Sequence, residues 1–335
     1  MKISSISNAN NKEWDETWAA CPYATYFHSG EWAEIWAQYT AGQFEQLKAA
    51  AQLISFTDGK KALLPLSYYA SYRGLIKKYV SSPGGTFGGW LSSDELTSEH
   101  ARLLSEHILQ NLPALEWRIN PYDPLKYIPE SSCMQQETTS TLSLEDDFEK
   151  IFRSWSKGHI AAVAQARKNG ITIGQASDRE AWRRYFNAYE QSIERWGKDK
   201  SSGYRWELFN LIYEKRSPHV RLWTASKEDK IIAGALCFYA KKHVVYWHGA
   251  ALQDYFKMRP VNLLLYEAIK DAKQQGYAWF DFNPSGKLEG VRAFKKSFGT
   301  EEFSCPLIKS YKYSLKNKLI IAGFRTFDKL KRMIR

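Results

Sequence analysis

The order of helix-like and strand-like segments in the second half of the chain restricts its fold most strongly. From about Leu144 to Ile308, the apolar spacing and the Gly and Pro positions predict the order α, β, α, α, β, β, β, α, β, α, β. The three successive strand-like runs are VRLWTAS, KIIAGALCFYA and HVVYWHGAA, and short charged turns that separate them predict antiparallel hairpins. A helix that begins at Pro260 then leads into the strand AWFDF, which completes a β-α-β unit. We therefore predict an α/β fold with a mixed sheet that binds ligands where neighbouring strands diverge.

The first half also alternates helices and strands. Its pattern predicts a helix over 31–39, strands over 49–56 and 62–69, and a helix over 94–111. Between them lies the glycine-rich turn SSPGGTFGGW, residues 81–90. This turn lacks the GKS or GKT ending of a phosphate-binding loop, so an ordinary turn beside a groove is favoured over a nucleotide site.

A change in composition separates the two halves. Residues 121–141 are rich in Pro, Ser and Thr and show no clear period, which is typical of a connection. A chain of 335 residues also has the length of about two domains of roughly 150 residues. We therefore predict one subdomain over 1–141, a second over 142–311, and a separate C-terminal segment over 312–335.

The positive charge of the chain is concentrated in that C-terminal segment. Residues 309–335 carry nine basic residues against one acid, whereas the other 308 residues carry 38 against 35. This distribution argues against a DNA-binding protein with a uniformly basic surface. On a helix, the apolar residues of 312–335 would occupy one half of the circumference and most cations the other. Such a basic amphipathic helix fits an anionic membrane surface, packing against its own domain, or attraction of tRNA phosphate.

Three absences in the sequence bear on chemistry and location. The four cysteines form no CxxC pair and the seven histidines no HExxH or HxxxH pattern, so we predict free thiols and no bound metal. No apolar run reaches the roughly 18 residues that a membrane span needs. We therefore expect a cytoplasmic protein, free or peripheral at the inner face of the membrane.

Several of these segments together resemble a known family. The run VYWHGAALQDYFKMRPVNLLLYEAIKDAKQQGYAWFDFNPSGKLEGVRAFKKSFG is similar to the signature region of the FemAB-like branch of the GNAT acyltransferases, and SKGHIAAVAQARKNGITI resembles the basic helix before its first strand. The resemblance is clear over residues 144–308 and looser over the first half. It implies two tandem GNAT-like subdomains that transfer an acyl or aminoacyl group to an amine or hydroxyl. It also implies a donor that is either aminoacyl-tRNA or acyl-CoA, and a cell-envelope acceptor such as a peptidoglycan peptide.

The same resemblance suggests which residues perform the chemistry. By its FK..FG element, Lys295 would stabilise the developing oxyanion and Phe294 would present its main-chain carbonyl to the nucleophile. Asp281, in the strand AWFDF, is a candidate general base or amine-orienting group. The alternatives are that Lys295 is a solvated residue of an amphipathic helix, and that Asp281 caps the NPSG loop.

The loop before the helix at Pro260 is the candidate donor-binding segment. A typical acetyl-CoA loop contains glycines, but residues 253–262, QDYFKMRPVN, contain none. This departure puts CoA binding by successive backbone amides in doubt. Lys257 and Arg259 can still pair with a phosphate at the helix N-terminus, and Asn262 closes the segment.

Three further residues complete the predicted binding set. His248, in YWHGA, lies on a strand predicted to face the cleft, and Arg167 and Lys168 end the basic helix. For each, the alternative is a structural or solvated role. Two other functions stay open: acyl-CoA-dependent acylation of a polysaccharide or small molecule, and a non-catalytic module that docks on a membrane or RNA.

Overall fold

The computed structural model consists of two compact units. The first comprises Met1–Glu137 with the chain from Cys305 onward, and the second comprises Thr138–Ser304. The sequence prediction divided the chain after residue 141, whereas these units divide after residue 137 and place residues 305–311 with the first unit. The predicted segment 312–335 lies outside the described residues except for Leu319. The structure describes residues 1–72, 74–112, 114–131, 133–196, 203–286, 288–311 and 319.

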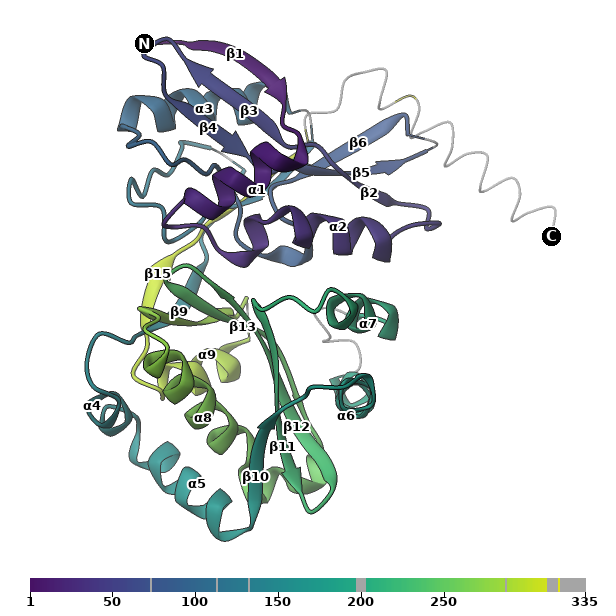
Figure 1. The fold of residues 1–335 in the computed structure, drawn as a ribbon, viewed down its shortest axis with the longest axis vertical. Helices are drawn as coiled ribbons and strands as arrows, with labels where there is room; N and C mark the ends of the chain where they lie inside the picture. The colour runs from purple at the N-terminus through teal and green to yellow at the C-terminus, as the bar shows by residue number, and fades with distance from the viewer. Residues whose placement is uncertain are drawn as a thin grey trace, which may run out of the picture. The chain divides into compact units, whose positions relative to one another are not determined.

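The first unit contains a six-stranded sheet of order β2-β5-β6-β7-β16-β8 and a three-stranded sheet of order β1-β3-β4 in its described residues (Figure 1). β6 and β7 are parallel and are joined through α3, whereas β5–β6 and β16–β7 pair antiparallel. The strands are β1 (Ile3–Asn8), β2 (Gln46–Ala49), β3 (Gln52–Phe56), β4 (Lys61–Leu64), β5 (Ser67–Ser71), β6 (Ile76–Val80), β7 (Ala114–Arg118), β8 (Met134–Gln135) and β16 (Leu307–Tyr311). The helices are α1 (Asn11–Ala20), η1 (Tyr26–His28), α2 (Gly30–Tyr39), η2 (Pro83–Gly85) and α3 (Ser98–Asn111).

Packing of α3 on the sheet forms the main core of this unit. Ala101, Leu104 and Ile108 follow helical spacing and are buried against Trp117 and Ile308, which come from β7 and β16. The glycine-rich turn predicted over 81–90 is a short 3₁₀ turn, η2. Its conformation needs glycine, because Gly84 has φ of +76° and an added Cβ would lie 2.8 Å from the Trp36 ring.

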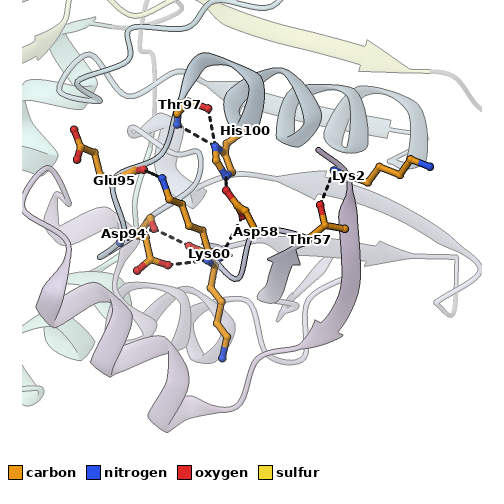
Figure 2. Close-up of polar contacts among 10 residues, drawn as sticks. Lys2, Thr57, Asp58, Lys60, Asp94, Glu95, Thr97 and His100 are labelled. Carbon is orange, nitrogen blue, oxygen red and sulfur yellow. Dashed lines mark hydrogen bonds and ion pairs between the residues drawn. The ribbon is translucent and has the colours of Figure 1, made fainter.

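A polar network ties the N-terminus of α3 to the β3–β4 turn (Figure 2). The buried His100 ring accepts at Nδ1 from the Thr97 backbone N–H at 3.1 Å, and its Nε2 lies 3.0 Å from Asp58 Oδ2. Lys60 Nζ donates to the Glu95 carbonyl on the other side of the turn. Partial desolvation opposes ionisation of Asp58, but the Lys60 N–H and His100 outweigh it and hold the pKa of this carboxyl below its usual value. One imidazole thus caps the helix and anchors the hairpin.

We expect His100→Ala to lower the free energy of unfolding of the first unit by about 2 kcal/mol, because it removes a cap and leaves a cavity. Urea denaturation followed by circular dichroism measures the effect. Gln110→Ala, an exposed position on the same helix, is the matched control. Equal midpoints for the two variants would show that the network contributes nothing to stability.

The second unit is built on a seven-stranded mixed sheet of order β10-β11-β12-β13-β14-β9-β15. Figure 1 shows α6 and α7 on one face, with α5, α8 and α9 on the other. β13 and β14 are parallel and are joined through α8. The strands are β9 (Thr138–Ser143), β10 (Ile171–Gln175), β11 (Val220–Lys227), β12 (Lys230–Ala240), β13 (His243–Ala251), β14 (Trp279–Pro284) and β15 (Glu301–Ser304). The helices are α4 (Phe148–Arg153), α5 (Lys157–Lys168), α6 (Arg179–Trp196), α7 (Trp206–Glu214), η4 (Gln253–Met258), α8 (Pro260–Gln274) and α9 (Glu289–Lys296).

The structure confirms the predicted mixed α/β class and most of the predicted order. In the first half, the strand predicted over 62–69 is two strands, β4 and β5, of different sheets. After residue 137 the structure differs from the prediction at three places. The helix predicted from Leu144 to Lys168 is divided into α4 and α5, because the Ser156 side chain caps a new helix. The end of the predicted connection, residues 138–141, instead belongs to the strand β9, inside the sheet. The single strand predicted near 303–308 is two strands, β15 and β16, which belong to different units.

Candidate active site

The parallel strands β13 and β14 pair over only part of their lengths. Their register runs from His243 opposite Trp279 to Val245 opposite Asp281, although β13 continues to Ala251. The register of β13 with β12 also shifts at Trp247, which marks a bulge. Strands that diverge in this way leave backbone groups for a ligand to pair with. The end of β14, where pairing with β13 stops, is therefore where the site begins.

Lys295 lies beside the end of β14 with its charge almost excluded from solvent. The residue is 6% exposed, and its Nζ donates a 2.6 Å hydrogen bond to the main-chain carbonyl of Asn283. A buried ammonium is costly unless it is paired, so this bond fixes where the charge is held. Asn283 itself has φ of +63°, a left-handed conformation that bends β14 near its end, where the register with β9 shifts between Asp281 and Pro284.

Asp281 holds that turn in place. Its Oδ1 accepts from the Asn283 N–H at 2.6 Å and from the Thr139 hydroxyl at 2.5 Å, and the residue is 0% exposed. The carboxylate therefore acts on the backbone two residues later, which is the arrangement of an Asx turn. This geometry agrees with the alternative that Asp281 caps the NPSG loop, and it does not support a direct role as general base. Sequence reasoning missed Thr139 and Asn283, which complete the network.

His159 connects the catalytic candidates on α9 with the start of α8. Its ring lies 5.1 Å from that of Phe294 and 4.4 Å from that of Phe298, centroid to centroid. Its Nδ1 is 3.2 Å from Asn262 Nδ2. Burial, with the nearby Arg259 charge, lowers the pKa of His159, so the ring is neutral at pH 7 and Nδ1 accepts from the amide. Sequence reasoning missed this residue.

A helical pattern in α5 was the signal that could have found it. His159 lies three, four and seven residues before the buried Ala162, Val163 and Ala166, so it shares their inward-facing side. The sequence prediction instead selected Arg167 and Lys168, at the far end of the same helix.

The start of α8 collects the predicted donor-binding residues. Arg259 is the N-cap in a left-handed conformation with φ of +60°, and Pro260 opens the helix. The side chains of Lys257 and Arg259 are exposed, whereas Asn262 is buried against His159. The carbonyl of Lys257 accepts from Gln165 Nε2 at 3.1 Å, which fastens the loop to α5. The helix N-terminus and two exposed cations together favour binding of an anion here.

The structure places His248 away from this cluster. His248 faces α6, where its Nδ1 lies within hydrogen-bonding distance, 2.7 Å, of the Tyr185 hydroxyl. Burial lowers the pKa of His248 to about 3, so the ring is neutral. α6 covers the face of the sheet opposite α8 (Figure 1).

The other two predicted cations also lie outside the cluster. Arg167 packs over the Tyr266 ring at 4.6 Å and lies 3.3 Å from Glu267, so it serves contacts between α5 and α8. Lys168 is exposed in the last turn of α5.

A surface hollow of about 800 Å³ is lined in part by η4. Three cations line it, Arg184 from α6 together with Lys227 and Lys230 at the β11–β12 turn, and the acidic residues of that turn, Glu228 and Asp229, line it as well. Tyr255, from η4, adds an aromatic wall beneath Lys230, whose Nζ is 5.2 Å from the ring centroid. This hollow and the start of α8 therefore flank one loop.

In the part of the chain that the structure describes, no three His, Cys, Asp or Glu side chains are gathered as ligands for a metal ion. Over the same residues, every helix is too short or too polar to cross a bilayer.

The sequence of the second unit matches a family model. Residues 153–296 match the family described as an acetyltransferase (GNAT) domain. This part of the chain, less than half of its length, is therefore similar to GNAT acetyltransferase domains. The FemAB-like resemblance seen in the sequence agrees with that assignment. In the comparison with curated proteins, no sequence matches.

Solved structures extend the likeness to both units. FemX has a TM-score of 0.67 and 16% identity, covering 90% of this chain and 96% of the other. L-PGS from Bacillus licheniformis has a TM-score of 0.55 and 13% identity, covering 95% and 97%. A conserved protein of unknown function from Bacteroides thetaiotaomicron has a TM-score of 0.57 and 11% identity, covering 92% and 99%. These likenesses establish the fold.

We expect Asp281→Ala to destabilise the second unit by about 3 kcal/mol, because it leaves the Asn283 N–H and the Thr139 hydroxyl buried without their acceptor. Chemical denaturation measures this loss. Glu301→Ala, which removes an exposed carboxylate from the neighbouring β15, serves as the control. A loss no larger than that of the control would contradict the positioning role of Asp281.

Proposed function

We propose that the protein transfers an acyl or aminoacyl group to an amine, or to a hydroxyl, of a cell-envelope precursor such as a peptidoglycan peptide. The observation that carries this proposal is the buried Lys295 ammonium, held by the Asn283 carbonyl at the end of β14 within the residues that match the GNAT domain family. Structural similarity to FemX supports the aminoacyl form of the reaction. Donors of this kind are found in the cytosol, so we infer that the protein acts there or at the inner face of the membrane.

In this proposal, Lys295 stabilises the negative charge that develops on the carbonyl oxygen of the donor. A positive group that is already oriented and desolvated needs no reorganisation as the charge forms, and such groups contribute strongly to acyl transfer. The backbone carbonyl of Phe294 would accept a hydrogen bond from the attacking amine and orient its lone pair. The tetrahedral intermediate would then expel the tRNA hydroxyl or CoA thiol of the donor, which takes up the proton that the amine loses. Asp281 and Thr139 would act through Asn283, as positioning residues.

The start of α8 would bind a phosphate of the donor through Lys257, Arg259 and the helix N-terminus. Aminoacyl-tRNA is the donor we favour, since residues 253–262 lack the glycines with which a typical CoA loop binds phosphate through backbone amides. Acyl-CoA is the second candidate, supported by the description of the matched family as an acetyltransferase domain. With that donor, a polysaccharide or small molecule is the alternative acceptor.

We expect Lys295→Ala to lower turnover by about a hundredfold or more, because the oxyanion loses its positive partner. Steady-state kinetics with the identified donor and acceptor measure the loss. Lys296→Ala is the matched control, since Lys296 is the next residue on α9 and is exposed. Equal turnover by both variants would reject the role of Lys295, and no turnover by the wild-type chain with any donor would favour a non-catalytic docking module.

The donor is identified most directly by thermal shift. A donor that saturates the folded protein should raise the melting temperature by about 5 °C or more. Aminoacyl-tRNA and acetyl-CoA are compared on the wild type, on Arg259→Ala and on Lys150→Ala, an exposed lysine on α4. We expect Arg259→Ala to lose most of the shift and Lys150→Ala to keep it. A shift that survives Arg259→Ala would place the phosphate elsewhere.

A further inference from the structure

The first unit exposes aromatic and aliphatic side chains where two loops meet. Phe44, in the α2–β2 connection, is 70% exposed, and Leu75, in the β5–β6 turn, is 56% exposed. The Phe44 ring packs edge-on against the ring of Tyr72, with centroids 5.5 Å apart. Figure 1 shows these connections at the same end of the unit. We call Phe44, Tyr72 and Leu75 the apolar tip.

Exposed lysines flank the apolar tip on one face of the sheet. Lys48 pairs with Tyr68 of β5, and Lys77 pairs with Ala70 of the same strand. Because Tyr68 and Ala70 are two residues apart, their side chains lie on one face of the sheet, and both lysines share that face. Lys77 Nζ lies 4.6 Å from the centroid of the Tyr68 ring. One acidic residue, Glu45, follows Phe44 in the sequence. Lys48 and Lys77 therefore outnumber the acidic residue beside the apolar tip.

The described chain leaves the sheet at this same end. β16 runs antiparallel to β7, and β7 is parallel to β6, so β16 ends on the side of the sheet where β6 begins. Lys78 confirms this placement, because its Nζ lies 5.8 Å from the ring centroid of Tyr311. In the sequence, residues 312–335 follow directly and hold eight of the nine basic residues counted above. The lysines beside the apolar tip, and Tyr311, after which the basic sequence follows, thus lie at the same end of the first unit.

The size and shape of the tip decide which partner it fits. A stable protein interface buries about 800 Å² on each partner, which three side chains on projecting loops do not supply. Aromatic side chains beside lysines are instead typical of the boundary between water and lipid, where the rings enter the interface and the cations meet phosphate. We propose that the apolar tip inserts into the headgroup region of an anionic membrane, with Lys48 and Lys77 on lipid phosphates.

The test is co-sedimentation of the full-length protein with vesicles of phosphatidylglycerol and phosphatidylcholine, compared with phosphatidylcholine alone. The wild type should bind the anionic vesicles more tightly, and added salt should weaken that binding. We expect the double substitution Phe44→Ser and Leu75→Ser to lower the partition coefficient by about tenfold or more, because two apolar side chains no longer leave water. Both positions are exposed, so the variant should melt at the wild-type temperature.

A matched variant separates this effect from a general loss of apolar surface. Ile6→Ser with Ile128→Ser removes two exposed aliphatic side chains elsewhere in the first unit, and it should bind vesicles as the wild type does. Equal binding by the tip variant and the wild type would overturn the proposal, as would no binding of the wild type to anionic vesicles. A tip variant that instead loses self-association in vesicle-free buffer would assign the tip to a protein contact and also overturn it. None of these outcomes depends on transferase activity, so they are distinct from a failure of the proposed function.

Discussion

The burial of one ammonium group at the end of a strand is the constraint on which the candidate site depends. Lys295 can be desolvated because the Asn283 carbonyl accepts a hydrogen bond from its ammonium group, and that carbonyl is available because Asn283 adopts a left-handed conformation near the end of β14. Asp281 fixes the turn through the Asn283 N–H, and Thr139 fixes Asp281 from the neighbouring strand. The charge is thus placed by backbone geometry more than by the flexible side chain that carries it.

The candidate site depends on both a parallel and an antiparallel neighbour of β14. The parallel pair β13–β14 separates after three paired positions, and the antiparallel strand β9 supports the other side of β14. β9 supplies the Thr139 hydroxyl that donates to Asp281. The strand that pairs with β14 therefore also completes the polar network. On the other side, His159 fills the space between α8 and α9 and couples the phosphate-binding end of one helix to the lysine-bearing helix.

Local patterns in the sequence were sufficient to predict the fold class, the order of most elements and the helix start at Pro260. Alternation and helical spacing are local signals, and they were strong in β11 to β13 and in α8. β9 was missed because its sequence TTSTLS is polar, and it is buried only through its neighbours β14 and β15. The same reason applies to the site: Lys295 and Asp281 could be selected from a motif, but the partners Thr139, Asn283 and His159 are defined by contacts across the fold. Tertiary packing places His248 against Tyr185 and Arg167 against Tyr266 and Glu267. Lys168 is exposed at the far end of α5.

The return of the chain to the first unit has a consequence for biosynthesis. β16 lies between β7 and β8 in the six-stranded sheet, yet it follows the whole second unit in the sequence. Residues 1–137 therefore emerge from the ribosome with one strand of their sheet missing, and that strand is added only after the second unit has emerged. Because strands waiting for a partner expose unpaired edges, the nascent first unit should be a substrate for chaperones while the second unit folds.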